Sequence, residues 1–378
     1  MATLEAFFEF EKPIANLEKK LSDLRELAQQ GGVDFSQEMT TLEKKVATLI
    51  DETYSKLTPW QKVQLSRHPN RPYTRDYIDL LFPDFMELQG DRYYGDDQAL
   101  LTGVATWPPI DPSDAPNASA LESDLTRTPI LIIGHQKGRS TKQKMERNFG
   151  MAKPDGYRKA MRVMELAERS RMPILTFIDT PGAYPGQDAE ERGQAQAIAE
   201  SIHKMFTLEV PIVSVVIGEG GSGGALAIGV ADRVLMQEYS IYSVISPESC
   251  ASILWSDSSL AERAADRLKM NPHELLKLGV IDAVVPEPKG GAHRDWIGAA
   301  KLLKKAIIKQ FEDLSEFPKV PAKAPAKSSA KNSKSSAKTA AKLPRTRIEA
   351  RSEKFRKMGS VGLAYAPVEE EGSNHVTQ

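Results

Sequence analysis

The chain has 378 residues, of which 40% are hydrophobic and 27% charged, a composition typical of a globular protein. Its one cysteine, Cys250, excludes an intrachain disulfide and any zinc site that needs two thiolates. The first residues do not resemble a secretory signal, and no apolar run is long enough to span a membrane. We therefore expect a cytoplasmic protein without a membrane segment.

The formal net charge of −1 conceals an uneven distribution of charge along the chain. Residues 319–358 contain thirteen Lys or Arg but only two Glu, whereas residues 1–318 have a net charge of −9. The carboxyl-terminal region should therefore behave as an electrostatic unit separate from a mildly acidic body.

An amphipathic pattern in residues 1–60 predicts two helices that form a hairpin. Apolar residues recur at three- and four-residue spacing, at Ile14, Leu17, Leu21, Leu24 and Ala28, and again at Leu42, Val46 and Leu49. This stripe needs a partner. It is either a docking surface for another subunit, which we favour, or a face that packs on the chain's own body.

Residues 61–317 alternate short apolar runs with helical stretches, which predicts an α/β fold. The strand-length runs are 129–134, 173–179, 211–217 and 233–236, and helices are expected around 157–169 and 190–206. Continuous apolar strands between helices indicate a sheet covered on both faces. The Pro-, Ser- and Asp-rich segment 107–129 is interpreted as a surface loop.

The carboxyl-terminal region divides into a linker, 318–342, and a basic helix with a tail, 343–378. The linker consists largely of Lys, Ala, Ser and Pro, a composition that predicts disorder. Its lysines could bind RNA or another anionic surface. We favour a solvated tether and consider nucleic acid an unlikely partner, because no aromatic residue is present for base stacking.

The strongest candidate for chemistry is the glycine-rich turn after the strand 211–217. It has the sequence Ile217-Gly-Glu-Gly-Gly-Ser-Gly-Gly-Ala225 and opens a short helix. Glycines let a backbone approach a ligand closely, and the N–H groups at the start of a helix attract anions. The turn therefore predicts a site for a bound phosphate or for negative charge that develops during a reaction.

The same glycines also fit a dinucleotide fingerprint, which would make the chain a nicotinamide oxidoreductase. Gly218, Gly220 and Gly223 have the spacing G-x-G-x-x-G, and Glu238 follows about twenty residues later. We favour this alternative less, because several strands precede the motif and the following helix, roughly 224–230, is short for a nucleotide-binding crossover.

Two further strand ends carry candidate site residues. Asp179-Thr-Pro-Gly-Ala-Tyr-Pro-Gly186 follows the strand 173–179 and should face the same crevice as the glycine-rich turn. In Gly134-His-Gln-Lys-Gly-Arg139, the side chains of His135, Lys137 and Arg139 could bind phosphate or carboxylate. The sequence lacks a G-x-S-x-G nucleophile elbow, an H-E-x-x-H motif and a P-loop, so we expect backbone groups to carry the chemistry.

These segments together resemble the α-subunit family of bacterial acetyl-CoA carboxylase carboxyltransferases. The resemblance extends from about residue 5 to residue 300 and departs from the family in a longer loop 107–129 and in the linker 318–342. Its motifs are Arg67-His-Pro-Asn-Arg-Pro-Tyr73, Gly134-His-Gln-Lys-Gly138, Arg147-Asn-Phe-Gly-Met151, Ile178–Gly186, Ile217–Gly229, Tyr242-Ser-Val-Ile-Ser-Pro-Glu248 and Pro286–His293.

The resemblance implies a crotonase-like spiral of ββα units within an α₂β₂ assembly. It implies transfer of a carboxyl group from carboxybiotin, borne by the biotin carboxyl carrier protein, to acetyl-CoA, which forms malonyl-CoA for fatty acid synthesis. Biotin carboxylase would be a further partner, and the complete assembly would bind ATP. Zinc would be held only by the β subunit, so no metal is expected in this chain.

The resemblance also implies roles for individual residues. Gly223, Gly224 and Ala225 would hold the biotin ureido oxyanion, and Gly182 and Ala183 would line the same crevice. Carboxybiotin and CoA would be bound with the help of Gly220, Gly221, Ser222, Tyr184, His135, Lys137 and Arg139. The oxyanion hole for the thioester would belong mainly to the β subunit, so this chain alone should be inactive.

Overall fold

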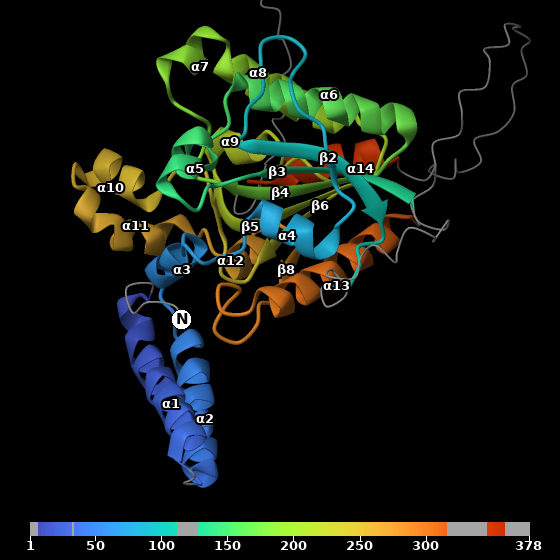
Figure 1. Cartoon of the computed structure of the whole chain (residues 1–378). Helices are drawn as coiled ribbons and strands as arrows, with labels where there is room; N and C mark the ends of the chain where they lie inside the picture. Colours follow the sequence, from blue (N-terminus) through green and yellow to red (C-terminus); the bar gives the residue numbers. More distant parts are fainter. Residues whose placement is uncertain (1–6, 32–33, 112–127, 316–345, 360–378) are drawn as a thin grey trace, which may run out of the picture.

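The computed structural model of the chain describes residues 7–31, 34–111, 128–315 and 346–359. These residues form a sheet covered by helices on both faces, with a two-helix arm extending from it (Figure 1). Most of the loop expected at 107–129 and all of the linker expected at 318–342 lie outside the described residues. Within the described ranges, no helix has both the length and the apolar character that crossing a lipid bilayer requires.

The eight-stranded sheet has the order β1-β2-β3-β4-β5-β6-β8, and β7 pairs with the end of β5. The strands β1 to β3 are antiparallel, whereas β3, β4, β5, β6 and β8 run parallel. The strands are β1 (Met86–Glu87), β2 (Leu100–Trp107), β3 (Thr128–His135), β4 (Ile174–Thr180), β5 (Ile212–Gly221), β6 (Arg233–Gln237), β7 (Ile241–Ser243) and β8 (Ala283–Val285). The four strands expected from apolar runs are confirmed as β3, β4, β5 and β6.

Two helical layers enclose the sheet because its strands are apolar on both faces. The helices α6 (Pro154–Ser170) and α8 (Gln194–Thr207) pack on one face, and α4 (Thr74–Leu81) and α13 (Trp296–Ser315) on the other. The expected helix 190–206 is divided: α7 (Gln187–Glu191) ends before Gly193, whose φ of +78° interrupts the helix.

Further helices surround the carboxyl ends of the parallel strands. They are α3 (Pro59–Ser66), α5 (Thr141–Glu146), η4 (Asn148–Gly150), α9 (Ser222–Leu226), α10 (Pro247–Trp255), η5 (Ser258–Leu260), α11 (Ala261–Leu268) and α12 (Pro272–Lys277). Figure 1 shows α5, α9 and α10 at the same end of the sheet. This end therefore collects the loops that follow β3, β4 and β5, where α/β folds place their sites.

The expected helical hairpin is confirmed as α1 (Lys12–Gly31), preceded by η2 (Glu9–Glu11), and α2 (Ser36–Tyr54). Its base packs on the body through a small apolar cluster that includes Ile14, Leu65 and Tyr239. Most of the hairpin extends away from the sheet (Figure 1). The chain's own body thus covers the base of the amphipathic stripe, and the outer part remains available for another subunit.

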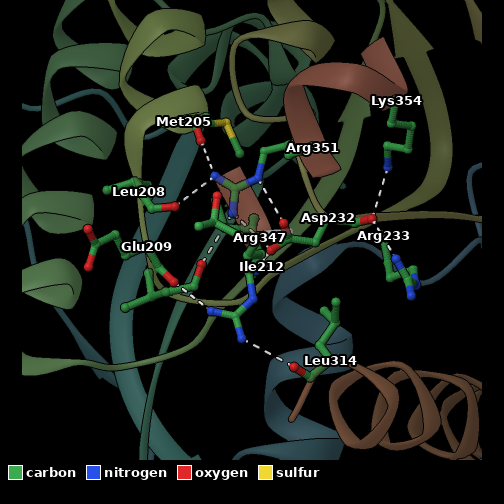
Figure 2. Close-up of polar contacts among 12 residues, drawn as sticks. Met205, Leu208, Glu209, Ile212, Asp232, Arg233, Leu314, Arg347, Arg351 and Lys354 are labelled. Carbon is green, nitrogen blue, oxygen red and sulfur yellow. Dashed lines mark hydrogen bonds and ion pairs between the residues drawn. The ribbon is translucent and has the colours of Figure 1, made fainter. Parts of the chain in front are cut away.

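The basic helix expected within 343–378 is confirmed as α14 (Arg347–Lys357), and it docks beneath α8. Figure 2 shows the Arg351 side chain inserted among backbone carbonyls and the carboxylate of Asp232. The guanidinium donates to the carbonyl oxygens of Met205, of Leu208 at 3.0 Å and of Val210 at 3.3 Å. Arg351 therefore caps the carboxyl end of α8, where helical carbonyls lack intrahelical partners.

Candidate functional site

A shift of register between β4 and β5 creates the backbone shape of the site. Ile178 pairs with Val216, but Thr180 pairs with Gly220, so β5 has two more residues than β4 in this interval. Such a bulge removes backbone groups from the hydrogen-bonding ladder and bends the strand. Buried backbone groups need other partners in that case.

Two buried side chains satisfy the backbone of this bulge. Arg71 Nε donates to the carbonyl oxygen of Ile217 at 2.6 Å, and the N–H of Glu219 donates to Asp179 Oδ1 at 3.0 Å. The Asp179 carboxylate also explains Gly218, because a Cβ atom at this position would lie 2.4 Å from Asp179 Oδ1. The end of β5 is therefore held in place by side chains from two other segments.

The helix α9 begins directly after β5, with Gly221 as its N-cap. Ser222 has a φ of +55°, a conformation that a residue with a side chain adopts at an energetic cost and that often marks a functional site. The N–H groups of Gly223 and Gly224 lie in the first turn of α9, where a helix provides no internal acceptor. Among the described residues, neither group donates to another backbone carbonyl.

The glycine turn of β5 packs directly against the turn that follows β4. A Cβ atom at Gly221 would lie 2.0 Å from the carbonyl oxygen of Pro181, and one at Gly224 would lie 2.4 Å from the nitrogen of Ala183. Only residues without a side chain permit this approach. The structure thus brings Gly182 and Ala183 against Gly221 and Gly224, as the sequence analysis expected.

The other glycines of the turn have different surroundings. A Cβ atom at Gly223 would meet only Ile198 Cγ2 at 3.5 Å, an ordinary contact, and Gly223 is partly exposed. A Cβ atom at Gly220 would lie 2.6 Å from the ring of Tyr242. Gly220 is therefore required by packing, whereas Gly223 lies on the open side of the turn.

A buried cluster of charges lies beneath the two turns. Lys137 Nζ lies 2.8 Å from Asp179 Oδ1 and 2.7 Å from Glu219 Oε2. Arg67 Nε donates to Glu219 Oε1 at 2.6 Å, and its Nη1 pairs with Glu248 of α10 at 2.5 Å. Burial opposes ionisation of Glu219, but the charges of Lys137 and Arg67 outweigh burial and lower the pKa of Glu219.

The three basic residues after β3 are separated by the fold. His135 is fully buried, and its ring faces the backbone of Gly224 and Phe177. Burial, with the nearby Lys137 ammonium as the second cause, lowers the pKa of His135 to about 3. Its imidazole is therefore neutral at physiological pH and lies under the glycine turn, not in solvent.

Arg139 and Tyr184 are engaged elsewhere. The Arg139 guanidinium lies 4.6 Å from the ring centroids of both Tyr73 and Trp296 and pairs with Asp76. The ring of Tyr184 lies 4.9 Å from the ammonium of Lys153. Neither side chain contacts the glycines of α9 among the interactions of the described residues.

One group of described residues has the spacing of metal ligands: Glu11, His68 and His293, all buried at the base of the hairpin. Hydrogen bonds already occupy it. Tyr54 donates to Glu11 Oε1 at 2.6 Å, His293 Nε2 lies 2.9 Å from the same oxygen, and the N–H of Asn70 donates to His68 Nδ1 at 3.1 Å. This arrangement fixes the hairpin to the body.

The structure also bears on the dinucleotide alternative. The helix after the glycines has only five residues, Ser222–Leu226, and it does not form the long crossover on which a dinucleotide fingerprint depends. Because α9 is short, its helix dipole is weak. The attraction of a negative charge to its start therefore depends mainly on the N–H groups of the first turn. No feature of the described residues supports nucleotide or ATP binding by this chain.

Comparison with protein families decides the relationship. A family described as acetyl co-enzyme A carboxylase carboxyltransferase-like matches residues 7–327. The chain belongs to this carboxyltransferase family. Membership confirms the resemblance found in the sequence, and the sheet topology confirms the predicted α/β fold.

Curated relatives of this carboxyltransferase family cover most of the chain. An acetyl-coenzyme A carboxylase carboxyl transferase subunit alpha of Methylococcus capsulatus is 52% identical over 312 residues, which are 82% of this chain and 92% of the relative. The corresponding subunit of Thermus thermophilus is 53% identical over 306 residues, 81% of this chain and 91% of the relative.

Two solved structures give more distant matches to the family member described here. A transcarboxylase 12S hexamer, with methylmalonyl-coenzyme A bound, matches with a TM-score of 0.49 and 17% identity. The match covers 69% of this chain and 44% of the transcarboxylase chain. A Pseudomonas malonate decarboxylase hetero-tetramer in complex with coenzyme A has a TM-score of 0.48 and 15% identity and covers 65% of this chain and 89% of its own.

Arg67, Arg71, Asp179 and Glu219 lie in segments singled out from the sequence, but their role in supporting the turn was not predicted. One signal was present, because Glu219 follows the apolar run 211–217 after a single residue and is flanked by glycines. A carboxylate at the end of a buried strand needs a buried cation. The identity of that cation, Lys137, could only come from the fold.

Proposed function

We propose that this chain is the α-type subunit of an acetyl-CoA carboxylase carboxyltransferase, which transfers the carboxyl group of carboxybiotin to acetyl-CoA. Membership of the carboxyltransferase family supports this function. The observation that carries it in the structure is the contact of Gly224 with Gly182 and Ala183, beside N–H groups of the first turn of α9 that donate to no backbone carbonyl among the described residues. Backbone donors held rigidly in place are what a reaction through oxyanions requires.

The reaction develops negative charge on two oxygens. As the bond between the carboxyl carbon and the ureido nitrogen breaks, CO₂ would leave and charge would accumulate on the ureido oxygen. The N–H groups of Gly223, Gly224 and Ala225 would hold this oxygen. The released nitrogen would then take a proton from the methyl group of acetyl-CoA, which places negative charge on the thioester oxygen. The resulting enolate would attack CO₂ through its carbon to form malonyl-CoA.

The remaining site residues would act around this centre. Gly220, Gly221 and Ser222 would form the backbone that presents the N–H groups, and Gly182 and Ala183 would close one side. His135 and Lys137 support the turn from below in this arrangement. Arg139 and Tyr184 would contact biotin or CoA only at the edge of the site.

A second subunit would complete the site. Large apolar side chains are exposed on α10 and just after β7, whose Ser243 pairs with Gly221: Val244 is 78% exposed, Ile253 74% and Leu254 62%. Single chains seldom leave such a group uncovered next to a site. We propose that a β subunit, which holds zinc and the thioester oxyanion hole, docks here within an α₂β₂ assembly in the cytoplasm.

The biotin carboxyl carrier protein would bring carboxybiotin to this site, and biotin carboxylase would use ATP to form it elsewhere in the complex. The test is to co-express the chain with a β subunit from the same source and to measure malonyl-CoA from carboxybiotin and acetyl-CoA. Activity of the pair, with none from either chain alone, is expected. Saturable NAD binding without carboxyl transfer would instead support the oxidoreductase alternative.

A further inference from the structure

Three successive parallel strands meet at one buried ammonium group. Lys137 follows β3, and its Nζ atom lies between Asp179 at the end of β4 and Glu219 in the bulge of β5, at 2.8 and 2.7 Å. We propose that Lys137 is a positioning residue, which holds the β4 and β5 turns together so that the α9 N–H groups face the reacting oxygen. This inference rests on the proposed function and adds a side chain to a site otherwise built from backbone.

The contact acts on the part of β5 that aims the turn. Asp179 Oδ1 accepts from both Lys137 Nζ and the N–H of Glu219, so one carboxylate joins the ammonium to the bulge backbone. Only three residues separate Glu219 from Gly223. A movement of Glu219 would therefore displace the first turn of α9.

Electrostatics makes the ammonium necessary. Asp179 and Glu219 are almost fully buried, with 3% and 10% of their side chains exposed. Without Lys137, two buried carboxylates would share the interval between the strands and repel each other. Burial opposes the charge of Lys137, but these carboxylates outweigh it and raise its pKa. Arg67 cannot replace Lys137, since it also pairs with Glu248.

The surroundings of Lys137 argue against direct binding of a substrate anion. Its side chain is 13% exposed, and η4 packs along its stem, where a Cβ atom at Gly150 would lie 2.9 Å from Lys137 Cγ. Two carboxylates already surround the ammonium. A phosphate or carboxylate would have to displace one of them, so the anion-binding role expected from the sequence is replaced by a supporting one in this proposal.

The test is Lys137→Met in the reconstituted complex with the β subunit. We expect kcat to fall about 100-fold, as for loss of one oxyanion donor, while KM for acetyl-CoA and for carboxybiotin changes less than about threefold. The double variant Lys137→Met/Asp179→Asn removes one of the two repelling charges and keeps an oxygen that accepts the Glu219 N–H. The kcat of the double variant should be at least about tenfold higher than that of Lys137→Met.

The matched control is Lys204→Met, because Lys204 pairs with Glu165 at 2.8 Å on the outer helices and its side chain is 30% exposed. It should change kcat less than about twofold. A kcat within about threefold of wild type for Lys137→Met, or a rise in KM alone, would overturn the inference. If Lys137→Met does not fold, the double variant Lys137→Met/Asp179→Asn provides the test. We expect its kcat to be about tenfold below that of wild type, with KM unchanged. A kcat equal to that of wild type would overturn the proposal. Failure of the proposed function can be distinguished from failure of this inference, because the wild-type complex itself would then form no malonyl-CoA.

Discussion

Arg351 and Asp232 form a fully buried, two-pronged ion pair between α14 and the start of β6. Nε of Arg351 lies 3.0 Å from Asp232 Oδ1, and Nη2 lies 2.9 Å from Oδ2 (Figure 2). Asp232 Oδ2 also accepts from the N–H of Ile212 at 2.8 Å. The pair therefore joins the carboxyl-terminal helix to the starts of β5 and β6. These strand starts lie at the opposite end of the sheet from the glycine turns.

Replacing Arg351 by Met should destabilise the folded chain by about 3–5 kcal/mol, the usual cost of leaving one partner of a buried ion pair alone. The variant leaves the Asp232 carboxylate uncompensated and removes the cap from the carbonyl oxygens of Met205 and Leu208. Urea unfolding of the full chain, followed by circular dichroism, measures the difference in free energy of unfolding.

Two variants show whether the charge of Asp232 causes this loss. In Arg351→Met/Asp232→Asn, the amide oxygen still accepts from Ile212 but carries no charge, so part of the stability should return. Lys357→Met changes an exposed residue of the same helix, 70% exposed, and should alter stability by less than about 0.5 kcal/mol. An equal loss for Arg351→Met and Lys357→Met would contradict the assigned role of the buried pair.

The two adjacent glycines of α9 should differ sharply in their tolerance of a methyl group. In Gly224→Ala, the new Cβ would lie 2.4 Å from the nitrogen of Ala183, so the two turns must separate. We expect carboxyl transfer to fall at least about 100-fold. In Gly223→Ala, the Cβ meets only Ile198 at 3.5 Å and the N–H is retained, so the loss should stay below about tenfold.

The measurement is the initial rate of malonyl-CoA formation by each reconstituted variant. Gly95→Ala serves as the control, because a Cβ atom there meets no atom within 4 Å and Gly95 lies outside the site. Equal activities of the Gly224 and Gly223 variants would mean that the close approach of the two turns has no part in catalysis.

The sequence predicted the strands and the glycine turn because both depend on local patterns. Apolar runs identify β3 to β6, and five glycines within seven residues indicate an unusual backbone. The support of that turn is not local. Glu219 is held by Lys137, 82 positions earlier, and by Arg67, 152 positions earlier. The sequence indicates a carboxylate at the end of a buried strand, but it cannot identify these two distant cations.

Other differences have similar causes. The helix expected at 190–206 is interrupted because Gly193 adopts a left-handed conformation, which a periodic pattern of apolar residues does not reveal. The strand expected to end at residue 217 continues to Gly221, because β7 pairs with Glu219, Gly220 and Gly221. Pairing with a strand 22 positions later overrides the low strand propensity of glycine.

Charged substitutions on α10 should weaken assembly with the β subunit without unfolding this chain. Ile253 and Leu254 are 74% and 62% exposed, so Ile253→Asp and Leu254→Asp leave its own core intact. If the proposed docking face is correct, each aspartate would be buried against the partner. This burial would weaken the free energy of association by at least about 2 kcal/mol, which raises the dissociation constant about 30-fold.

Analytical ultracentrifugation of the mixed subunits measures this change. Leu276→Asp is the control, because Leu276 is 41% exposed on α12 and does not belong to the proposed face. Unchanged assembly of both α10 variants would show that the β subunit docks elsewhere, for example on the outer part of the α1–α2 hairpin.

The neutral imidazole of His135 should make the folded chain sensitive to acid. An unfolded histidine titrates near pH 6.5, whereas burial and Lys137 lower the pKa of His135 to about 3 in the fold. Between these values the unfolded chain binds a proton that the folded chain does not. Stability is therefore greatest above pH 6.5 and falls as the pH decreases, by up to about 1.4 kcal/mol per pH unit from this group.

The substitution His135→Gln removes the titrating group. Altered packing lowers the stability of the variant at pH 7, but the difference in free energy of unfolding between wild type and variant should shrink from pH 7 to pH 5. Urea unfolding at half-unit steps of pH measures both slopes. His203→Gln, a change at an exposed histidine of α8, should follow the wild-type slope. Identical slopes for wild type and His135→Gln would show that His135 accepts a proton within the folded chain, and that the space beneath Gly224 admits a charge.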